Sequence, residues 1–534
     1  MADVTWFNKS VFVVDRKFGG SNELRHLSIS SYTGRMIREG SHSRNATRVL
    51  DCSGGTRACD AATLALWLRR KKHDFAKRTH LNVNPCVFID RKRLGIWIQG
   101  SEFHFVPWCL CGSTWRNQTN QAKIKPKNCC RLHHMLKMAM QIAVAGRPGR
   151  LAGLILVLLL FASPWLPAQV FRPDKLAAMD TAIETAITNH QCPGGVLWLE
   201  HNGVAYHKAY GYRALVPKPE PMTEDTIFDM ASLTKVIATT PAIMLLIERG
   251  RVKLDAPVSA YIPAFTGEGR GKVTVRELLT HTSGLPADLE TNDWHGYATA
   301  INMACNEKLQ FPPGTAFGYS DINFILLGEI VQRVTKTPLQ DFVQREIYEP
   351  LKMTDTGFLP SKSKLSRVAP TEVVNGEPWR GVVHDPSARR MGGVAGDAGL
   401  FSTASDLARF ARMMLNLGEL DGVRIFESDT VKLMTTPQTP SAVHVLHGLG
   451  WDIDSPYSGP RGKLFPIGSY GHTGWTGTSI WIDPFSKTFV IFLSNRNHPT
   501  EAGNVIALRR QLGTLAAQAV IGFNFTNVPG ALHP

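Results

Sequence analysis

The amino-acid sequence predicts an α/β fold of the α+β kind for residues 170–525. Short apolar runs typical of strands stand at both ends of this stretch, and the first two are joined by Asn202-Gly203, a strong hairpin signal. The segments between the ends carry helical periodicity, which predicts one sheet formed from the two ends and a helical lobe inserted between them. The expected strands are residues 195–201, 204–210, 478–483 and 488–494.

The expected helices follow from apolar spacing and from boundary residues. Leu176, Met179 and Ile183 recur on one face of the first helix. The helix that begins at Ser232 should stop at Gly250 and bend at Pro241, because proline has no backbone N–H to donate. The expected helices are residues 174–191, 232–249, a short one from about 276 that ends in the turn 281–286, 321–334 and 403–417.

Residues 1–134 differ from the rest of the chain in charge. Of the 59 Lys and Arg, 26 lie in residues 1–150, against only 9 of the 44 Asp and Glu, so the net charge of +15 belongs to this part. Its short basic runs are interpreted as solvated charge, and no nucleic-acid partner is expected. The segment shows no sustained periodicity or repeat. We interpret it as an aperiodic basic segment that is spurious or disordered.

Seven of the nine cysteines also lie in this first part. Cys109, Cys111, Cys129 and Cys130 precede His133 and His134, but their spacing fits no common zinc pattern. We therefore expect no metal and no organic cofactor. The other two cysteines, Cys192 and Cys305, could form a disulfide in an oxidising compartment, although spacing alone does not pair them.

Residues 135–168 have the layout of a secretory signal peptide or membrane anchor. Arg147 and Arg150 precede about a dozen apolar residues, and a small-residue exit with two prolines follows. Residues 151–168 together just reach the length that crosses a bilayer. We expect the domain after residue 168 to be exported to the periplasm or the outside, and to remain on the membrane if the segment is uncleaved.

A further hypothesis concerns the start of translation. A signal peptide belongs at an N-terminus, and three methionines, Met135, Met138 and Met140, precede this one. Translation from one of them would make residues 1–134 upstream sequence. Peptides from residues 1–134 in the natively expressed protein, found by mass spectrometry, would exclude this start.

Ser232 and Lys235 are the candidate catalytic pair. Three positions apart at the start of a helix, they fall on the same helical face. A serine hydroxyl is a weak nucleophile near neutral pH, and a neighbouring lysine is one way to activate it. Ser-x-x-Lys is also common by chance, as a capping serine followed by a surface lysine. The pair therefore needs support from the rest of the chain.

Three further groups complete the candidate site. Tyr319, in a loop before a helix that begins at Asp321, could move a proton if nearby cations lower its pKa. The segment His472-Thr473-Gly474-Trp475, at the edge of the terminal strands, offers a hydroxyl and backbone N–H groups for an oxyanion or a substrate carboxylate. The glycine-rich loop 383–402 suits packing over a cleft. Each of these is also compatible with an ordinary packed aromatic, a turn or a surface loop.

Taken together, residues 170–520 resemble the serine β-lactamase and penicillin-binding-protein family, in its class C, D-alanyl-D-alanine carboxypeptidase and esterase branch. The resemblance implies a β-lactamase/transpeptidase-like fold, an antiparallel sheet flanked by helices on both faces plus the helical lobe. The motifs that carry it are Ser232 to Lys235, Leu278 to Pro286, Pro313 to Asp321, and His472 to Gly474.

The resemblance also implies a mechanism. Ser232 attacks a carbonyl while Lys235 and Tyr319 relay its proton, and the backbone N–H groups of Ser232 and Trp475 hold the oxyanion. The implied partner is a small-molecule or peptide substrate with an ester or amide bond, including cell-wall-derived ones.

Two positions depart from the β-lactamase pattern. Asp321 stands where asparagine is usual, so it cannot donate to a substrate amide, and it should favour the charged form of Lys235. His472 stands where lysine is usual and should carry only partial charge near pH 7. Both changes favour an esterase or D-amino-acid peptidase. The alternatives are a class C-type β-lactamase and a penicillin-binding sensor without turnover.

Overall fold

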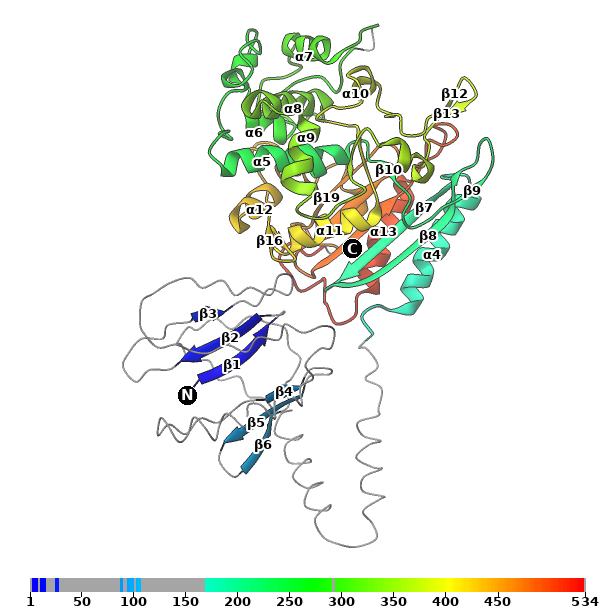
Figure 1. Cartoon of the computed structure of the whole chain (residues 1–534). Coiled ribbons are helices and arrows are strands. Elements are labelled where there is room, and N and C mark those ends of the chain that lie inside the picture. Colours follow the sequence, from blue (N-terminus) through cyan, green and yellow to red (C-terminus); the bar gives the residue numbers. More distant parts are fainter. Residues whose placement is uncertain are drawn as a thin grey trace. The chain divides into compact units, whose positions relative to one another are not determined.

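The computed structural model describes residues 2–7, 10–15, 25–27, 87–89, 94–99, 102–106, 169–290 and 293–532 (Figure 1). The chain divides into two compact units, Met1–Val157 and Leu158–Pro534. Among the described residues, no helix has the length and apolar composition needed to cross a membrane. Residues 135–168, where the sequence predicts a signal peptide or anchor, lie outside the described residues.

The first unit contains two small antiparallel sheets, for which the sequence analysis predicted no elements. Each strand has six residues or fewer, too few for a sustained period to stand out. One sheet pairs β1–β2–β3 and the other pairs β4–β5–β6. The bounds are β1 Ala2–Phe7, β2 Ser10–Asp15, β3 Arg25–Leu27, β4 Val87–Ile89, β5 Leu94–Gln99 and β6 Glu102–Val106.

The second unit is organised around an eight-stranded sheet with the order β17-β18-β19-β20-β21-β7-β8-β9, in which neighbours pair antiparallel. The two ends of the domain meet where β21 pairs with β7, as the sequence predicts. The predicted hairpin is present: Asn202 and Gly203 both have positive φ, 50° and 80°, as a type I′ turn requires. The bounds are β7 Gly194–His201, β8 Val204–Ala214, β9 Glu220–Pro221, β17 Leu446–His447, β18 Asp452–Asp454, β19 Tyr470–Thr473, β20 Ser479–Asp483 and β21 Thr488–Leu493.

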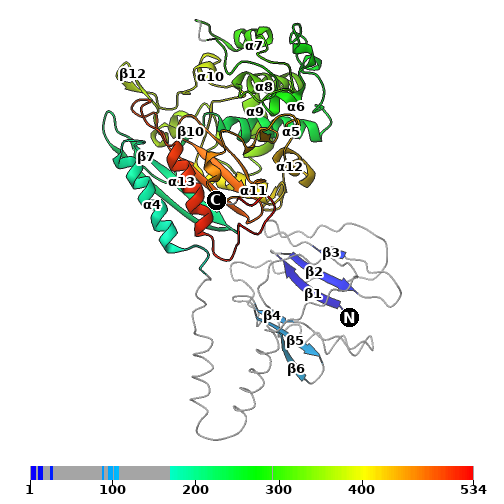
Figure 2. The same ribbon diagram turned by 180° about the vertical axis from the view of Figure 1, so that it is seen from behind.

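Helices cover both faces of this sheet (Figures 1 and 2). Helices α4 (Pro173–Thr188) and α13 (Ile506–Ala519) pack together on one face, and α11 (Ala404–Leu415) packs on the other. Two hydrophobic cores result, one on each side of the sheet. Cys192 is buried in one core and Cys305 in the other, and both are free thiols, so they form no disulfide with each other.

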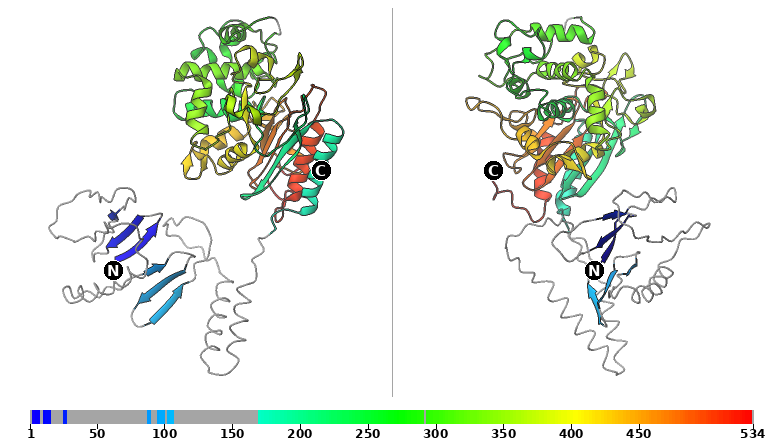
Figure 3. Two further views of the ribbon diagram at one scale, coloured as in Figure 1. Left: turned by 45° about the vertical axis from the view of Figure 1, so that its right-hand side comes forward. Right: turned by 60° about the vertical axis from the view of Figure 1, so that its left-hand side comes forward.

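The middle of the chain forms the inserted lobe, on the side of the sheet away from α4 and α13 (Figure 3). Its helices are α5 Thr240–Glu248, α6 Val275–Leu279, α7 Tyr297–Asn306, α8 Asp321–Thr335, α9 Leu339–Val343, α10 Pro386–Arg390 and α12 Ser428–Thr435. Short turns of 3₁₀ type in the second unit are Val258–Ala260, Arg270–Lys272, Lys362–Arg367 and Gly459–Arg461, and its π turns are Lys235–Thr239 and Gln344–Tyr348.

The second unit also has small strands outside the main sheet: β10 Phe228–Asp229, β11 Gly357–Phe358, β12 Val373–Val374, β13 Glu377–Pro378, β14 Leu400–Ser402, β15 Glu419–Leu420 and β16 Val423–Arg424.

The helix predicted from Ser232 to Arg249 differs from expectation at its start. Helical structure begins at Leu233, but residues Lys235–Thr239 form a wide π turn before the regular helix α5 continues from Thr240. Pro241 follows just after this wide turn. π turns of this kind often occur at functional sites.

Candidate active site

Ser232 lies at a sharp turn between β10 and the π turn. Ala231, the residue before it, has φ 46°, a left-handed conformation that is uncommon for a residue with a side chain. The backbone N–H of Ala231 donates to Asp229 Oδ1 at 2.9 Å, and Thr478 Oγ1 donates to the Met230 carbonyl at 3.0 Å. These contacts hold the strained turn and leave the Ser232 side chain only half-buried, facing a cleft.

Lys235 is fully buried and its ammonium has three partners. Its Nζ lies 3.0 Å from Ser232 Oγ, 2.6 Å from Asp321 Oδ1 and 3.0 Å from the Asp397 carbonyl oxygen. Burial alone would lower the pKa of Lys235, but the negative charge of Asp321 raises it above its usual range. Lys235 is therefore a cation at neutral pH, as the presence of Asp321 predicts.

Tyr319 lies beside this pair. The Lys235 Nζ is 5.2 Å from the centre of its ring, and both Lys235 and Ser232 act to lower the pKa of its hydroxyl. Burial nevertheless raises the pKa of Tyr319 above its usual value, because it outweighs the opposing charge of Lys235. The expectation of a lowered tyrosine pKa is wrong, since Asp321 adds a second effect that raises it.

His281 supports Tyr319 from behind. Its ring stacks on the tyrosine ring with centres 4.5 Å apart, and its Nδ1 accepts the backbone N–H of Ser320 at 3.1 Å. It is fully buried, and burial lowers its pKa well below the usual value, so the ring is neutral. His281 lies in the stretch 278–286 that contributed to the family resemblance, but the sequence alone gave it no role.

His472 and Thr473 close the opposite side of the cleft at the end of β19. His472 is buried, and its Nδ1 lies 2.8 Å from the Thr473 carbonyl oxygen. Burial, assisted by the charge of Lys235, lowers the pKa of His472 to about 3. The expected partial charge on His472 is therefore wrong: the ring is neutral near pH 7, because it lies deeper than its position at a strand edge implies.

Gly474 fits tightly between this strand and the turn that carries the serine. A Cβ at this position would lie 2.4 Å from the Met230 carbonyl oxygen and 2.2 Å from Thr478 Oγ1, so only glycine is accommodated. The next residue, Trp475, is 62% exposed and lines the cleft together with Ser232. The two residues predicted to supply the oxyanion N–H groups therefore lie on the same cleft.

Three carboxyl groups surround Lys235, of which the sequence predicted only Asp321. Carboxylate oxygens of Asp321, Asp385 and Asp397 lie within 4.8 Å of one another. Burial raises the pKa of Asp385 to about 7. Burial also raises the pKa of the Asp397 carboxyl group, whose two oxygens have no hydrogen-bond partner among the described residues, well above its usual range. Asp385 and Asp397 lie in the glycine-rich loop 383–402, where the sequence gives no motif that assigns them a role.

That loop, residues 383–402, only partly packs as expected. His384, Asp385 and Pro386 line the cleft. Further on, Gly396 instead packs against α8, where a Cβ would lie 1.9 Å from the Phe324 carbonyl oxygen.

The cleft has a volume of about 870 Å³, and Ser232, Tyr319, Asp321 and the segment 472–475 all contribute to its wall. The structure thus brings all eight predicted site residues together. Seven of them line the cleft, whereas Lys235 is fully buried behind the wall and contacts Ser232 and Asp321. Among the residues that the structure describes, two groups contain three possible metal-ligating side chains each: Asp321, Asp385 and Asp397, which already surround the Lys235 ammonium, and Glu372, His384 and Glu501.

An antiparallel sheet with an inserted helical lobe, and a Ser-x-x-Lys pair beside a tyrosine in a cleft, define a β-lactamase-fold serine hydrolase. A sequence model of the family described as Beta-lactamase matches residues 179–514. The chain belongs to the β-lactamase family, whose members include carboxypeptidases, esterases and β-lactamases.

Individual relatives agree with this assignment. A protein of Escherichia coli (strain K12) named "Putative D-alanyl-D-alanine carboxypeptidase" is 33% identical over 370 residues, which cover 61% of this chain and 84% of the relative. Two solved structures share the fold at 22% identity. A class C beta-lactamase covers 66% of this chain and 98% of its own with a TM-score of 0.54. EstCE1, a hydrolase with promiscuous acyltransferase activity, matches over 64% of this chain and 98% of its own chain, with a TM-score of 0.53.

Proposed function

We propose that this chain is a serine hydrolase that forms a covalent acyl-enzyme on Ser232 with an ester or amide substrate. The observation that carries the proposal is the 3.0 Å contact between Lys235 Nζ and Ser232 Oγ at the wall of an open cleft. The cation favours the serine alkoxide over the neutral hydroxyl, which is the form that attacks a carbonyl.

The protonation states of Lys235 and Tyr319 before substrate binds determine what must happen before Ser232 can attack. Lys235 is charged and Tyr319 is neutral, because both pKa values are raised. One proton must leave the group formed by Ser232, Lys235 and Tyr319 before the serine can attack, so kcat/KM should rise with pH on the alkaline side. Backbone N–H groups of Ser232 and Trp475 then hold the oxyanion, and losing one such donor costs about 3–4 kcal/mol of barrier in comparable enzymes.

The side chains around the serine favour an ester or a D-amino-acid peptide over a β-lactam. Asp321 is an acceptor held by Lys235 at 2.6 Å, so it has no proton to give to a substrate amide carbonyl. His472 is neutral and offers no charge to anchor a substrate carboxylate. A class C β-lactamase would need both interactions from other residues.

Comparing three substrates on the same enzyme preparation tests this proposal. We expect kcat/KM for a p-nitrophenyl ester, which has neither an amide nor a carboxylate, to exceed that for nitrocefin by about 10²-fold or more, the effect of losing one neutral and one charge-assisted contact. A D-alanyl-D-alanine peptide tests whether D-amino-acid peptides are also substrates. Equal or faster nitrocefin turnover would identify a β-lactamase. A stable penicillin adduct with no turnover of any substrate would identify a sensor.

Asp321→Asn is expected to change both pH dependence and substrate choice. Asp321 raises the pKa values of Lys235 and Tyr319, so its removal lowers both and moves the alkaline limb of the kcat/KM profile to lower pH. The new amide also donates a hydrogen bond, so penicillin acylation should become about tenfold faster. Stopped-flow acylation and a pH–rate profile measure these effects. An unchanged profile would show that Asp321 does not control the protons of the site.

We also propose that the hydrolase domain acts outside the cytoplasm, on small or peptide substrates that include cell-wall-derived ones. The basic and apolar segment 135–168 supports export, and residues 151–168 would hold the domain to the membrane if left uncleaved. Cell fractionation that recovered the active domain in the cytoplasm would overturn this.

A further inference from the structure

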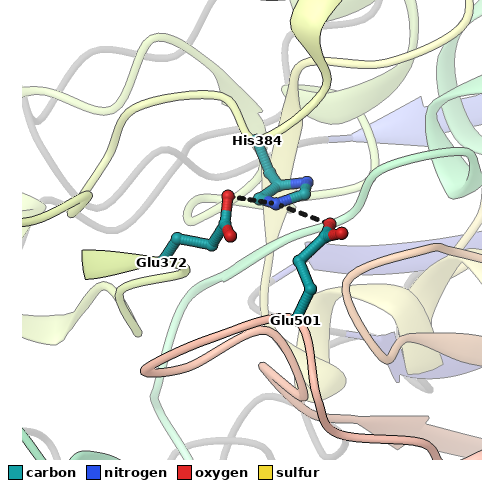
Figure 4. A group of neighbouring side chains, drawn as sticks. All are labelled: Glu372, His384 and Glu501. Atoms are coloured by element: carbon teal, nitrogen blue, oxygen red, sulfur yellow. Dashed lines mark hydrogen bonds and ion pairs between the residues drawn. The ribbon is translucent and has the colours of Figure 1, made fainter. Parts of the chain in front are cut away.

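Glu372, His384 and Glu501 form a cluster at the rim of the cleft that the hydrolytic mechanism does not use. Both carboxylates reach the same ring nitrogen: Glu372 Oε2 and Glu501 Oε1 each lie 3.2 Å from His384 Nε2. Figure 4 shows the two glutamates approaching this nitrogen from separate segments of the chain. His384 and Glu501 line the same cleft as Ser232.

The hydrogen bonding of the cluster is frustrated without a further group. A single N–H on Nε2 can donate a well-aligned hydrogen bond to one of the two carboxylates but not to both. Asn497 Nδ2, a donor, lies 2.9 Å from Nε2 and 3.4 Å from Nδ1, so an N–H on either ring nitrogen faces an N–H of the amide. If the ring is neutral and Nε2 carries no proton, the Nε2 lone pair points at the two glutamate carboxylates and is repelled by them. A cation between His384, Glu372 and Glu501 removes this repulsion.

Asn497 supplies an independent sign of the same conflict. Its side chain is fully buried, it faces His384, and its Oδ1 has no hydrogen-bond partner among the described residues. Turning the amide by 180° would place Oδ1 at the present position of Nδ2, 2.9 Å from Nε2 and 3.2 Å from the Glu501 carboxylate, so the amide alone does not remove the conflict. A metal ion bound to an unprotonated Nε2 removes it, an arrangement typical of metal-binding histidines.

The spacing of the three side chains matches a transition-metal site. In a tetrahedral zinc site with bonds of about 2.0–2.1 Å, neighbouring ligand atoms are about 3.3 Å apart, close to the two 3.2 Å separations. All three ligand atoms lie within 4.8 Å of one another. One imidazole and two carboxylates suit zinc, and three protein ligands leave a fourth position for water or substrate.

The surrounding contacts fix the ligands in place. The His384 backbone N–H donates to Asp229 Oδ2 at 2.8 Å, and its carbonyl accepts from Arg389. Glu501 Oε1 accepts the indole N–H of Trp475 at 2.8 Å. Such outer hydrogen bonds orient ligands in metal sites.

We propose that Glu372, His384 and Glu501 bind a divalent transition-metal ion, with zinc as its representative, at the rim of the active-site cleft. The ion ties the segment before β12 and the loop before α10 to the loop that carries Glu501. Through Glu501 it also fixes Trp475, which lines the same cleft as the reacting serine. This role is separate from acyl transfer and does not depend on the proposed activity.

Zinc binding to the full chain tests the proposal. Untagged protein is stripped with EDTA and titrated with zinc against a chromophoric chelator. The chain has nine cysteines, so the informative quantity is the difference between wild type and Glu372→Gln/Glu501→Gln. The two glutamates are 30% and 43% exposed, and their amides keep the shape of the side chains, so the variant should fold. Glu224→Gln, which removes an exposed carboxylate 2.8 Å from His207, is the matched control.

We expect wild type and Glu224→Gln to bind one more zinc equivalent than the double variant, and each single glutamate variant to bind that ion about tenfold or more weakly. Zinc should also raise the unfolding temperature of wild type more than that of the double variant. Equal zinc equivalents, affinities and temperature shifts in all proteins would overturn the proposal and leave a hydrogen-bonded histidine between two carboxylates.

Discussion

Replacing Ser232 with alanine is expected to lower kcat for ester hydrolysis by at least about 10⁴-fold, because Ser232 carries the hydroxyl that Lys235 activates. The fold should be almost unaffected, since the half-buried serine loses mainly its hydrogen bond with Lys235, worth about 1 kcal/mol of unfolding free energy. Steady-state kinetics with a p-nitrophenyl ester and a urea unfolding curve measure the two effects.

Ser363→Ala is the matched control for this change. Ser363 is exposed in the 3₁₀ turn Lys362–Arg367 and hydrogen bonds only with another exposed serine, Ser361. It should keep wild-type activity. A Ser232→Ala enzyme that retained more than about a tenth of wild-type kcat would assign the nucleophile to another group.

Replacing Lys235 with methionine is expected to cost both activity and stability. The buried ammonium is the cation shared by the Ser232 hydroxyl and the Asp321 carboxylate, so kcat should fall by about 10³-fold or more. Removing one partner of a buried ion pair leaves the other uncompensated, and the free energy of unfolding should fall by about 3–5 kcal/mol near neutral pH. Lys432→Met, which breaks an exposed pair with Asp429, should leave the free energy of unfolding almost unchanged.

The stability loss in Lys235→Met should grow as pH rises. Burial holds the pKa of Asp385 at about 7 in the folded protein, against 3.8 for an ordinary aspartate, and Lys235 acts to lower it. Without the lysine, the pKa values of Asp385 and Asp397 rise further, so the folded state binds more protons than the unfolded state above about pH 4. The loss relative to wild type therefore grows as pH rises above about 7, where Asp385 ionises in the folded wild type but stays protonated in the folded variant. Unfolding curves at pH 5 and pH 8 measure this, and an equal loss at both would contradict the shared-charge arrangement.

Much of the fold was predictable because its signals are local. The Asn202-Gly203 turn, the apolar strands near the C-terminus and the periodicity of α8 each depend on neighbouring residues. The short strands of the first unit were not predictable, since six residues or fewer carry too little pattern. The π turn after Ser232 was also missed, because the apolar pattern of residues 232–249 gives no sign of it.

The candidate site divides in a similar way. Motif spacing identified Ser232, Lys235 and Tyr319, which the structure places together. Burial, however, cannot be read from spacing, and it reverses two expectations: the pKa of Tyr319 is raised and that of His472 is lowered to about 3. Contacts between distant loops, such as Asp397 with Lys235, have no signal in a single sequence.

The most direct test of the central claim is intact-protein mass spectrometry after treatment with a fluorophosphonate, followed by peptide mapping. The structure predicts one phosphonyl group per chain, on the peptide that contains Ser232, and none on the Ser232→Ala protein. An adduct on a different serine, or one that persists in Ser232→Ala, would contradict the assignment of Ser232 as the nucleophile.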